Sequence, residues 1–180
     1  MKLKDNYFLL LLFVCFAIFF VNLDAIFVNI MEARNFATAR EMINLDHWIF
    51  TTLNNEPRYE KPPLPTWLTA VFMMLFGMKN LIAARLPAAV MGSIVSIFLY
   101  KLGLKFTNNG KYAFISGLIG ATSFYILFSG RDGQWDIHTH GWMIMAIYFL
   151  FQIFQDTGNS MKNAVLSGIF IGCSFLSKGP

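Results

Sequence analysis

The chain has 180 residues, of which 56% are hydrophobic, 17% aromatic and 13% charged. A soluble domain carries roughly 25% charged residues. In water this chain would therefore expose large apolar patches, and its composition predicts an integral membrane protein. The net charge of +4 does not indicate nucleic-acid binding, because the lysines are scattered between apolar runs instead of forming a basic stripe.

The first predicted element is an uncleaved spanning helix over residues 7–23. Lys2 and Lys4 precede this apolar run and favour a cytoplasmic N-terminus. The run is longer than the apolar core of a signal peptide, and no A-x-A cleavage site follows it. A solvated outer loop over residues 24–80 comes next, and it contains many of the charged side chains.

Two interfacial helices are predicted within this outer loop. Residues 31–43 contain good helix formers and neither Gly nor Pro, and their polar and apolar residues fall on opposite faces. This pattern is typical of an amphipathic helix on a membrane surface. Residues 66–78 are apolar and bounded by Pro65 and Gly77, but they are shorter than the ~20 residues that a span requires. They predict a second interfacial or half-inserted helix.

Four further spanning helices bring the predicted total to about five. All are expected to be α-helices, because lipid offers no partners to unpaired backbone groups. We therefore expect an all-α, polytopic fold with a single membrane domain over residues 1–180. The chain ends directly after an apolar run, which favours the N-terminal part of a longer protein. The four spans are predicted over residues 81–99, 112–128, 137–154 and 164–176, separated by polar breaks over residues 101–111, 130–136 and 155–163.

The distribution of charge supports this topology. With the N-terminus inside, the cytoplasmic segments carry six lysines against two aspartates, as the positive-inside rule expects. The remaining eight bases and eight acids lie on the outer side, a mixture that indicates pairing or ligand binding. The cytoplasmic charges are Lys2, Lys4, Lys101, Lys105, Lys111 and Lys162, with Asp5 and Asp156.

The densest charged clusters of the outer loop carry a specific resemblance. The clusters are Glu32-Ala33-Arg34 with Arg40-Glu41-Met42, and Arg58-Tyr59-Glu60-Lys61-Pro62-Pro63, with Trp48 between them and Arg85-Leu86-Pro87 after them. Together they resemble the polyprenyl-phosphate-sugar-dependent glycosyltransferases of the protein O-mannosyltransferase and aminoarabinose lipid A transferase type. The matches to the family motifs are Glu32, Arg34, Arg40, Glu41, Met42, Trp48, Tyr59, Lys61, Pro62 and Pro63.

The resemblance implies a multi-span, inverting glycosyltransferase of the GT-C fold in the bacterial inner (plasma) membrane. Such an enzyme moves a sugar from a polyprenyl-phosphate carrier to a lipid, glycan or protein acceptor on the non-cytoplasmic side. An acid must take the proton of the attacking group, and cations must stabilise the departing phosphate. Lys61 is the implied phosphate ligand, and Arg58, Arg34 and Tyr59 are implied substrate contacts. A solvated lysine is the structural alternative for Lys61.

One position departs from the family pattern. The acid of the family's outer loop, its implied catalytic base, precedes the glutamate, and Met31 stands there in this chain. Glu32 or Asp24 takes over this role, or the base lies elsewhere. The structural alternative for Glu32 is an ion pair with Arg34 or Arg40.

A second cluster, over residues 131–140, precedes a predicted span on the same outer side. Asp136 matches an acid that the family carries before this helix, so it is a third candidate for catalysis. Asp136 and His140 are four residues apart and share a helix face, whereas His138 points away. They could contribute to a divalent metal site, although no third ligand is evident. Alternatively, Asp136 caps the helix N-terminus.

The Lys178-Gly179 pair matches a family feature at the end of a later span, and the Lys178 cation is predicted to face the lipid phosphate. A helix-end lysine is the alternative. Two other functions compete with the enzyme. A transporter or lipid flippase predicts charges at mid-span and repeated halves, whereas the charges here cluster at one interface. A non-catalytic scaffold would tolerate loss of Lys61.

Overall fold

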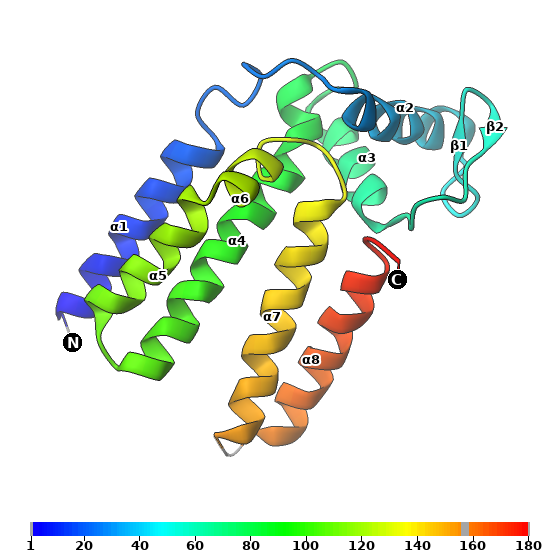
Figure 1. The fold of residues 1–180 in the computed structure, drawn as a ribbon. Coiled ribbons are helices and arrows are strands. Elements are labelled where there is room, and N and C mark those ends of the chain that lie inside the picture. Colours follow the sequence, from blue (N-terminus) through cyan, green and yellow to red (C-terminus); the bar gives the residue numbers. More distant parts are fainter. Residues whose placement is uncertain (1, 156–158, 180) are drawn as a thin grey trace.

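The computed structural model describes residues 2–155 and 159–179, and it is helical apart from one short hairpin (Figure 1). Asp156, placed at the cytoplasmic side above, lies outside the described residues. The elements are α1 (Lys2–Phe19), α2 (Ile30–Leu45), β1 (Thr52–Leu53), β2 (Glu56–Pro57), α3 (Leu64–Phe76), α4 (Leu81–Thr107), α5 (Gly110–Thr122), α6 (Phe124–Ser129), α7 (Asp136–Phe154) and α8 (Ser160–Phe175).

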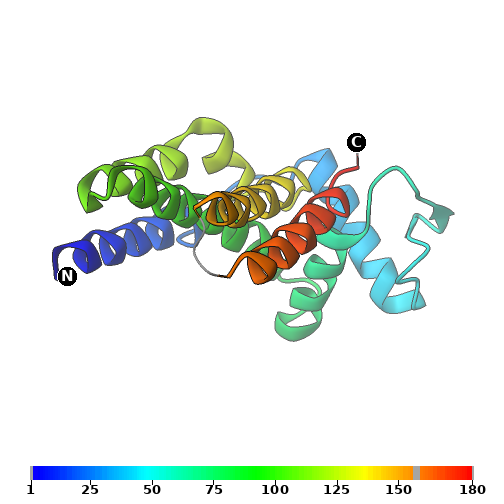
Figure 2. The same cartoon turned by 90° about the horizontal axis from the view of Figure 1, so that it is seen from below.

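The long helices lie side by side, and the chain runs back and forth through α1, α4, α5 with α6, α7 and α8. Helix α4 is the centre of this arrangement, because it packs against α1, α3, α5 and α7. Helices α2 and α3 and the hairpin gather at one end, beside the C-terminus and away from the N-terminus (Figures 1 and 2). The predicted outer loop therefore forms a cap over one end of the helices.

The helix predicted over residues 31–43 is α2. The Asn29 side chain caps it by accepting a hydrogen bond of 3.0 Å from the Glu32 N–H. Its apolar face does not lie free for a membrane surface, because Phe36 and Ala39 are buried in a cluster with residues of α3 and α4, among them Met73. Helix α2 therefore packs its apolar face against other helices of the protein.

The polar break predicted over residues 101–111 begins too early, because α4 has 27 residues in all and ends at Thr107. Lys101 remains within the helix, where its ammonium lies 4.5 Å from the centre of the Phe98 ring. This cation–π contact lets a charged residue extend an apolar helix.

The span predicted over residues 112–128 is divided into α5 and α6. Ser123 separates them with an extended ψ of 132°, and its hydroxyl donates a 3.1 Å hydrogen bond to the Gly120 carbonyl. Such local bonds compete with the helical pattern. The break redirects the chain toward the loop of residues 130–135.

The sequence did not predict the hairpin. Asn54 and Asn55 form its turn with positive φ of 55° and 63°, a conformation that asparagine tolerates. The Glu41 carboxylate accepts bonds of 2.6 Å from the Thr52 hydroxyl and the Asn54 N–H. The matched family residue Glu41 thus fixes the hairpin on α2.

In the part of the chain that the structure describes, α4 and α7 are long and apolar enough to cross a membrane. Helix α3 and residues Asn6–Phe19 of α1 are apolar but shorter.

Candidate functional site

A buried ion pair between α2 and α4 positions the outer loop. Both carboxylate oxygens of Glu32 accept from Arg85, with Nε to Oε1 at 2.6 Å and Nη2 to Oε2 at 2.7 Å, and both side chains are essentially inaccessible. Arg85 also donates to the Leu23 carbonyl, and the Gly133 N–H donates to Glu32 Oε1, each at 2.8 Å. The predicted pairing of Glu32 with Arg34 or Arg40 is therefore wrong, and the partner of Glu32 is Arg85.

These partners enclose the Glu32 carboxylate. Its two oxygens are engaged and no part of the residue is exposed, so an acceptor hydroxyl cannot reach it in this conformation. Asp24, the other candidate in the outer loop, is exposed in the connection between α1 and α2. It is not among the residues that line the cavity described next.

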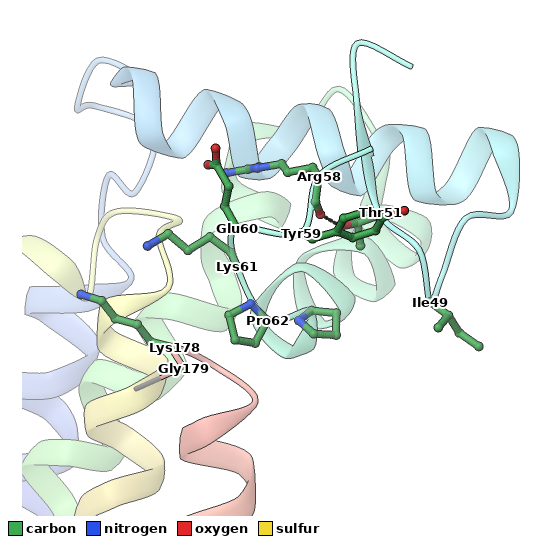
Figure 3. Close-up of a pocket in the computed structure, with 10 residues that line it drawn as sticks. Ile49, Thr51, Arg58, Tyr59, Glu60, Lys61, Pro62, Lys178 and Gly179 are labelled. Carbon is green, nitrogen blue, oxygen red and sulfur yellow. Dashed lines mark hydrogen bonds between the residues drawn. The ribbon is translucent and has the colours of Figure 1, made fainter. Parts of the chain in front are cut away.

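A cavity of about 640 Å³ opens between the loop before α3 and the C-terminal end of α8 (Figure 3). The Lys61 and Lys178 side chains extend in the same direction beside it. The two segments are joined by a 3.2 Å hydrogen bond from the Leu64 N–H to the Leu176 carbonyl. Four predicted substrate contacts thus meet in one place. The lining residues are Ile49, Thr51, Arg58, Tyr59, Glu60, Lys61, Pro62, Pro63, Lys178 and Gly179.

Arg58 is the unusual member of this lining, because it is 6% exposed and forms no ion pair with a described carboxylate. Its Nη1 donates 2.9 Å to the Thr38 hydroxyl, and its guanidinium lies 5.0 Å from the centre of the Trp135 ring. Its Nε and Nη2 have no hydrogen-bond partner among the described residues. Burial lowers the pKa of Arg58, although the charge of Glu60 opposes this effect.

Asp136 reaches the same cavity through Lys178, to which it forms a 2.8 Å ion pair. This hydrogen bond raises the pKa of Lys178. The other Asp136 oxygen accepts from the Tyr125 hydroxyl at 3.3 Å, and that hydroxyl lies 3.4 Å from His140 Nε2. Asp136 and His140 therefore both contact the Tyr125 hydroxyl, as expected for residues on one face of a helix. His138 is buried.

No group of three or more His, Cys, Asp and Glu residues that could hold a metal occurs within residues 2–155 and 159–179. Arg34 lies apart from the main cavity and lines a neighbouring one of about 230 Å³ with Arg58 and Glu60. Two acids of this region were not predicted. Glu60 lines both cavities, and its place between Tyr59 and Lys61 was the available signal. Asp132 lies in the second cluster, but its burial could not be seen in the sequence.

The chain matches a known protein family and is similar to known bacterial proteins. Residues 60–180 match the family described as dolichyl-phosphate-mannose-protein mannosyltransferase. The chain is 28% identical over 151 residues to the undecaprenyl phosphate-alpha-4-amino-4-deoxy-L-arabinose arabinosyl transferase of Shewanella sediminis, and 25% over 152 residues to the enzyme of the same name from Pseudomonas savastanoi. These matches cover 82% of this chain but 27% and 28% of the relatives.

The fold is similar to two crystal structures of ArnT from Cupriavidus metallidurans, one in the apo state and one bound to undecaprenyl phosphate. In each case the TM-score is 0.87 and the sequence identity 23%, over 97% of this chain. The chain spans 33% and 32% of those proteins. It therefore corresponds to about a third, or less, of the proteins that it resembles.

We expect Glu32→Ala and Arg85→Ala each to lower the free energy of unfolding by about 3–5 kcal/mol, because each leaves an unpaired buried charge. The double variant Glu32→Ala/Arg85→Ala should lose less than the sum of the two. Denaturation of the purified protein in detergent measures this coupling. Glu41→Ala, which removes an acid from the hairpin side of α2, is the control and should be additive with Arg85→Ala. Additivity of the Glu32 and Arg85 losses would contradict the pairing.

Proposed function

Because the chain belongs to the dolichyl-phosphate-mannose-protein mannosyltransferase family, we propose that the protein is a membrane glycosyltransferase of the GT-C type. It moves a sugar from a polyprenyl-phosphate carrier to a lipid, glycan or protein acceptor on the non-cytoplasmic side of a membrane. The observation that supports this proposal is the gathering of Arg58, Lys61 and Lys178 in one cavity.

The cavity suits the phosphate of such a carrier. Three cations line it against one acid, Glu60, and charge-assisted hydrogen bonds to a phosphate are among the strongest that proteins form. Arg58 has two buried nitrogens, Nε and Nη2, without a partner among the described residues, and their N–H groups cost free energy unless a ligand satisfies them. As the bond to the sugar breaks, these cations would stabilise the departing phosphate.

The remaining predicted residues take supporting roles. Tyr59 is exposed at the cavity and offers an aromatic surface to the sugar or to the first isoprene units. Asp136 holds the ammonium of Lys178 toward the site. Arg34 lies one cavity away and acts on the site through the neighbouring Arg58, and Glu32 holds the outer loop in place.

We further propose that the chain forms one multi-pass membrane domain with five spans, α1, α4, α5 with α6, α7 and α8, in a bacterial inner membrane. The back-and-forth path of the chain supports this count. The candidate cavity then lies at the outer end of the spans, with residues 24–80 outside. Lys105 and Lys111, at the opposite end of α4 and the start of α5, face the cytoplasm.

Lys61→Ala in the full-length protein should lower the rate of sugar transfer from a radiolabelled polyprenyl-phosphate sugar by about 10- to 100-fold. This range corresponds to the loss of one hydrogen bond to a charged group. Lys111→Ala, an exposed lysine far from the cavity, is the matched control and should keep wild-type turnover. Full turnover by Lys61→Ala would contradict the proposed phosphate site in this cavity.

Undecaprenyl phosphate should raise the thermal unfolding midpoint of the full-length protein, and Arg58→Gln should reduce this rise. A tenfold weaker affinity corresponds to about 1.4 kcal/mol less stabilisation at saturating ligand. The midpoint without ligand should fall little, because the substitution removes an unpaired buried charge along with its bond to Thr38. Arg40→Gln, which changes an exposed arginine of α2, is the control. A variant that unfolds early yet keeps the full ligand effect would contradict a binding role.

The five-span topology predicts opposite accessibilities for two introduced cysteines in a variant lacking Cys15 and Cys173. Glu56→Cys, on the exposed hairpin, should react with a membrane-impermeant maleimide in intact spheroplasts. Lys111→Cys should react after the cells are lysed, because it faces the cytoplasm. Labelling of both positions in intact cells would contradict the proposed number of spans.

A further inference from the structure

The proposed reaction still lacks a group that accepts the proton of the attacking hydroxyl. Met31 stands where the family's loop acid is expected, and Glu32 is fully engaged by Arg85 and Gly133. Asp136 is paired with Lys178. Asp132, in the loop between α6 and α7, is a buried carboxylate with one oxygen that has no hydrogen-bond partner among the described residues.

Asp132 belongs to a different loop from Met31, but it lies beside the segment in which the expected acid is missing. It is 3% exposed, and its Oδ2 accepts a 2.8 Å hydrogen bond from Nδ2 of Asn29, two residues before Met31. Gln134 Nε2 donates to the same oxygen. Oδ1 has no hydrogen-bond partner among the described residues. One oxygen is therefore held in place and the other is free.

The residue lines a cavity of about 150 Å³ together with Asp136 and Tyr125. This volume equals the liquid share of roughly five water molecules, which is room for the hydroxyl-bearing end of an acceptor but not for a lipid. Asp136 also contacts Lys178, a lining residue of the larger phosphate cavity. An ion pair thus joins a lining residue of the small cavity to a lining residue of the phosphate cavity.

We propose that Asp132 is the catalytic base of the transfer reaction, in place of the acid that Met31 replaces. The acceptor hydroxyl transfers its proton to Asp132 Oδ1 as its oxygen forms a bond to the anomeric carbon. The bond from that carbon to the phosphate oxygen breaks, and its electron pair leaves with the phosphate, which Lys61 holds. This inference rests on the proposed glycosyltransferase function and adds the residue that activates the acceptor, a hydroxyl compound.

The electrostatic surroundings suit this role. Burial raises the pKa of Asp132 above the ordinary value of an aspartate, and the nearby charge of Glu32 raises it further. The hydrogen bonds from Asn29 and Gln134 and the charge of Arg85 act in the opposite direction. Asp136 is the other carboxylate on the same small cavity. A base with a raised pKa binds a proton more readily during the reaction.

The test uses the full-length protein with a radiolabelled polyprenyl-phosphate sugar and measures transfer against pH. Asp132→Asn should lower the turnover number by about 10²- to 10⁴-fold, the usual share of a general base, while binding of undecaprenyl phosphate is kept. Asp46→Asn, an equal charge change at an exposed position, should leave both unchanged. Wild-type activity should fall as the pH drops through the pKa of Asp132, and this limb should be absent from the residual activity of Asp132→Asn.

A second variant keeps the test decisive if Asp132→Asn unfolds. Asn29→Ser retains a side-chain oxygen to cap α2 but removes the amide that donates to Asp132. Because that bond lowers the pKa of Asp132, its loss should move the acidic limb to higher pH. A purely structural Asp132 would leave the limb in place and overturn the proposal. Loss of the limb in Glu60→Gln or Asp136→Asn, with Asp132→Asn active, would also overturn it. Absence of any transfer by the wild-type protein would instead contradict the proposed function itself.

Discussion

The ion pair between Glu32 and Arg85 is the interaction on which the outer end of the molecule depends. A guanidinium within a largely apolar helix is costly unless its charge is compensated, and Glu32 compensates it through two short bonds. The same pair binds the connection between α1 and α2 at Leu23 and the loop after α6 at Gly133. The α1–α2 connection, α2, α4 and the loop after α6 are thereby held at one point.

The loop of residues 130–135 connects this structural pair to the candidate site. Arg131 donates to the Ile18 carbonyl in the last turn of α1, where a cation complements the helix dipole. It also donates to the Asn22 carbonyl just after the helix, at 2.6 Å. Gly133 binds Glu32, and Trp135 lies under the Arg58 guanidinium. A Cβ on Gly133 would lie 2.5 Å from the Phe36 ring, so this close approach requires glycine. One loop therefore contacts both the ion pair and Arg58, a lining residue of the candidate cavity.

The sequence was sufficient for the helical class, which follows from apolar runs, and for four of the ten lining residues of the cavity, which follow from motifs shared with the family that the chain resembles. Lys61 and Lys178 were both predicted to face a lipid phosphate, and the structure brings both to one cavity. The partner of Glu32 could not be predicted, since Arg85 lies 53 positions away and Arg34 and Arg40 are close in the chain. The break at Ser123 was missed because a single hydrogen bond decides it within a continuous apolar run.

The two buried arginines, Arg85 and Arg58, differ in their hydrogen-bond partners, and this difference distinguishes a structural residue from a candidate site residue. All three terminal nitrogens of Arg85 are hydrogen bonded, and a carboxylate neutralises its charge. Arg58 is nearly as buried, yet two of its three nitrogens lack a partner among the described residues and a ring, not a carboxylate, lies against it. If Arg58 were a packing residue, a facing carboxylate would stabilise it at little structural cost, and Glu60 is close enough in sequence to provide one. The charge of Glu60 acts on Arg58, but no described carboxylate forms an ion pair with it. A guanidinium that lines a cavity without an ion pair is the arrangement expected of a group whose counter-charge arrives with a ligand.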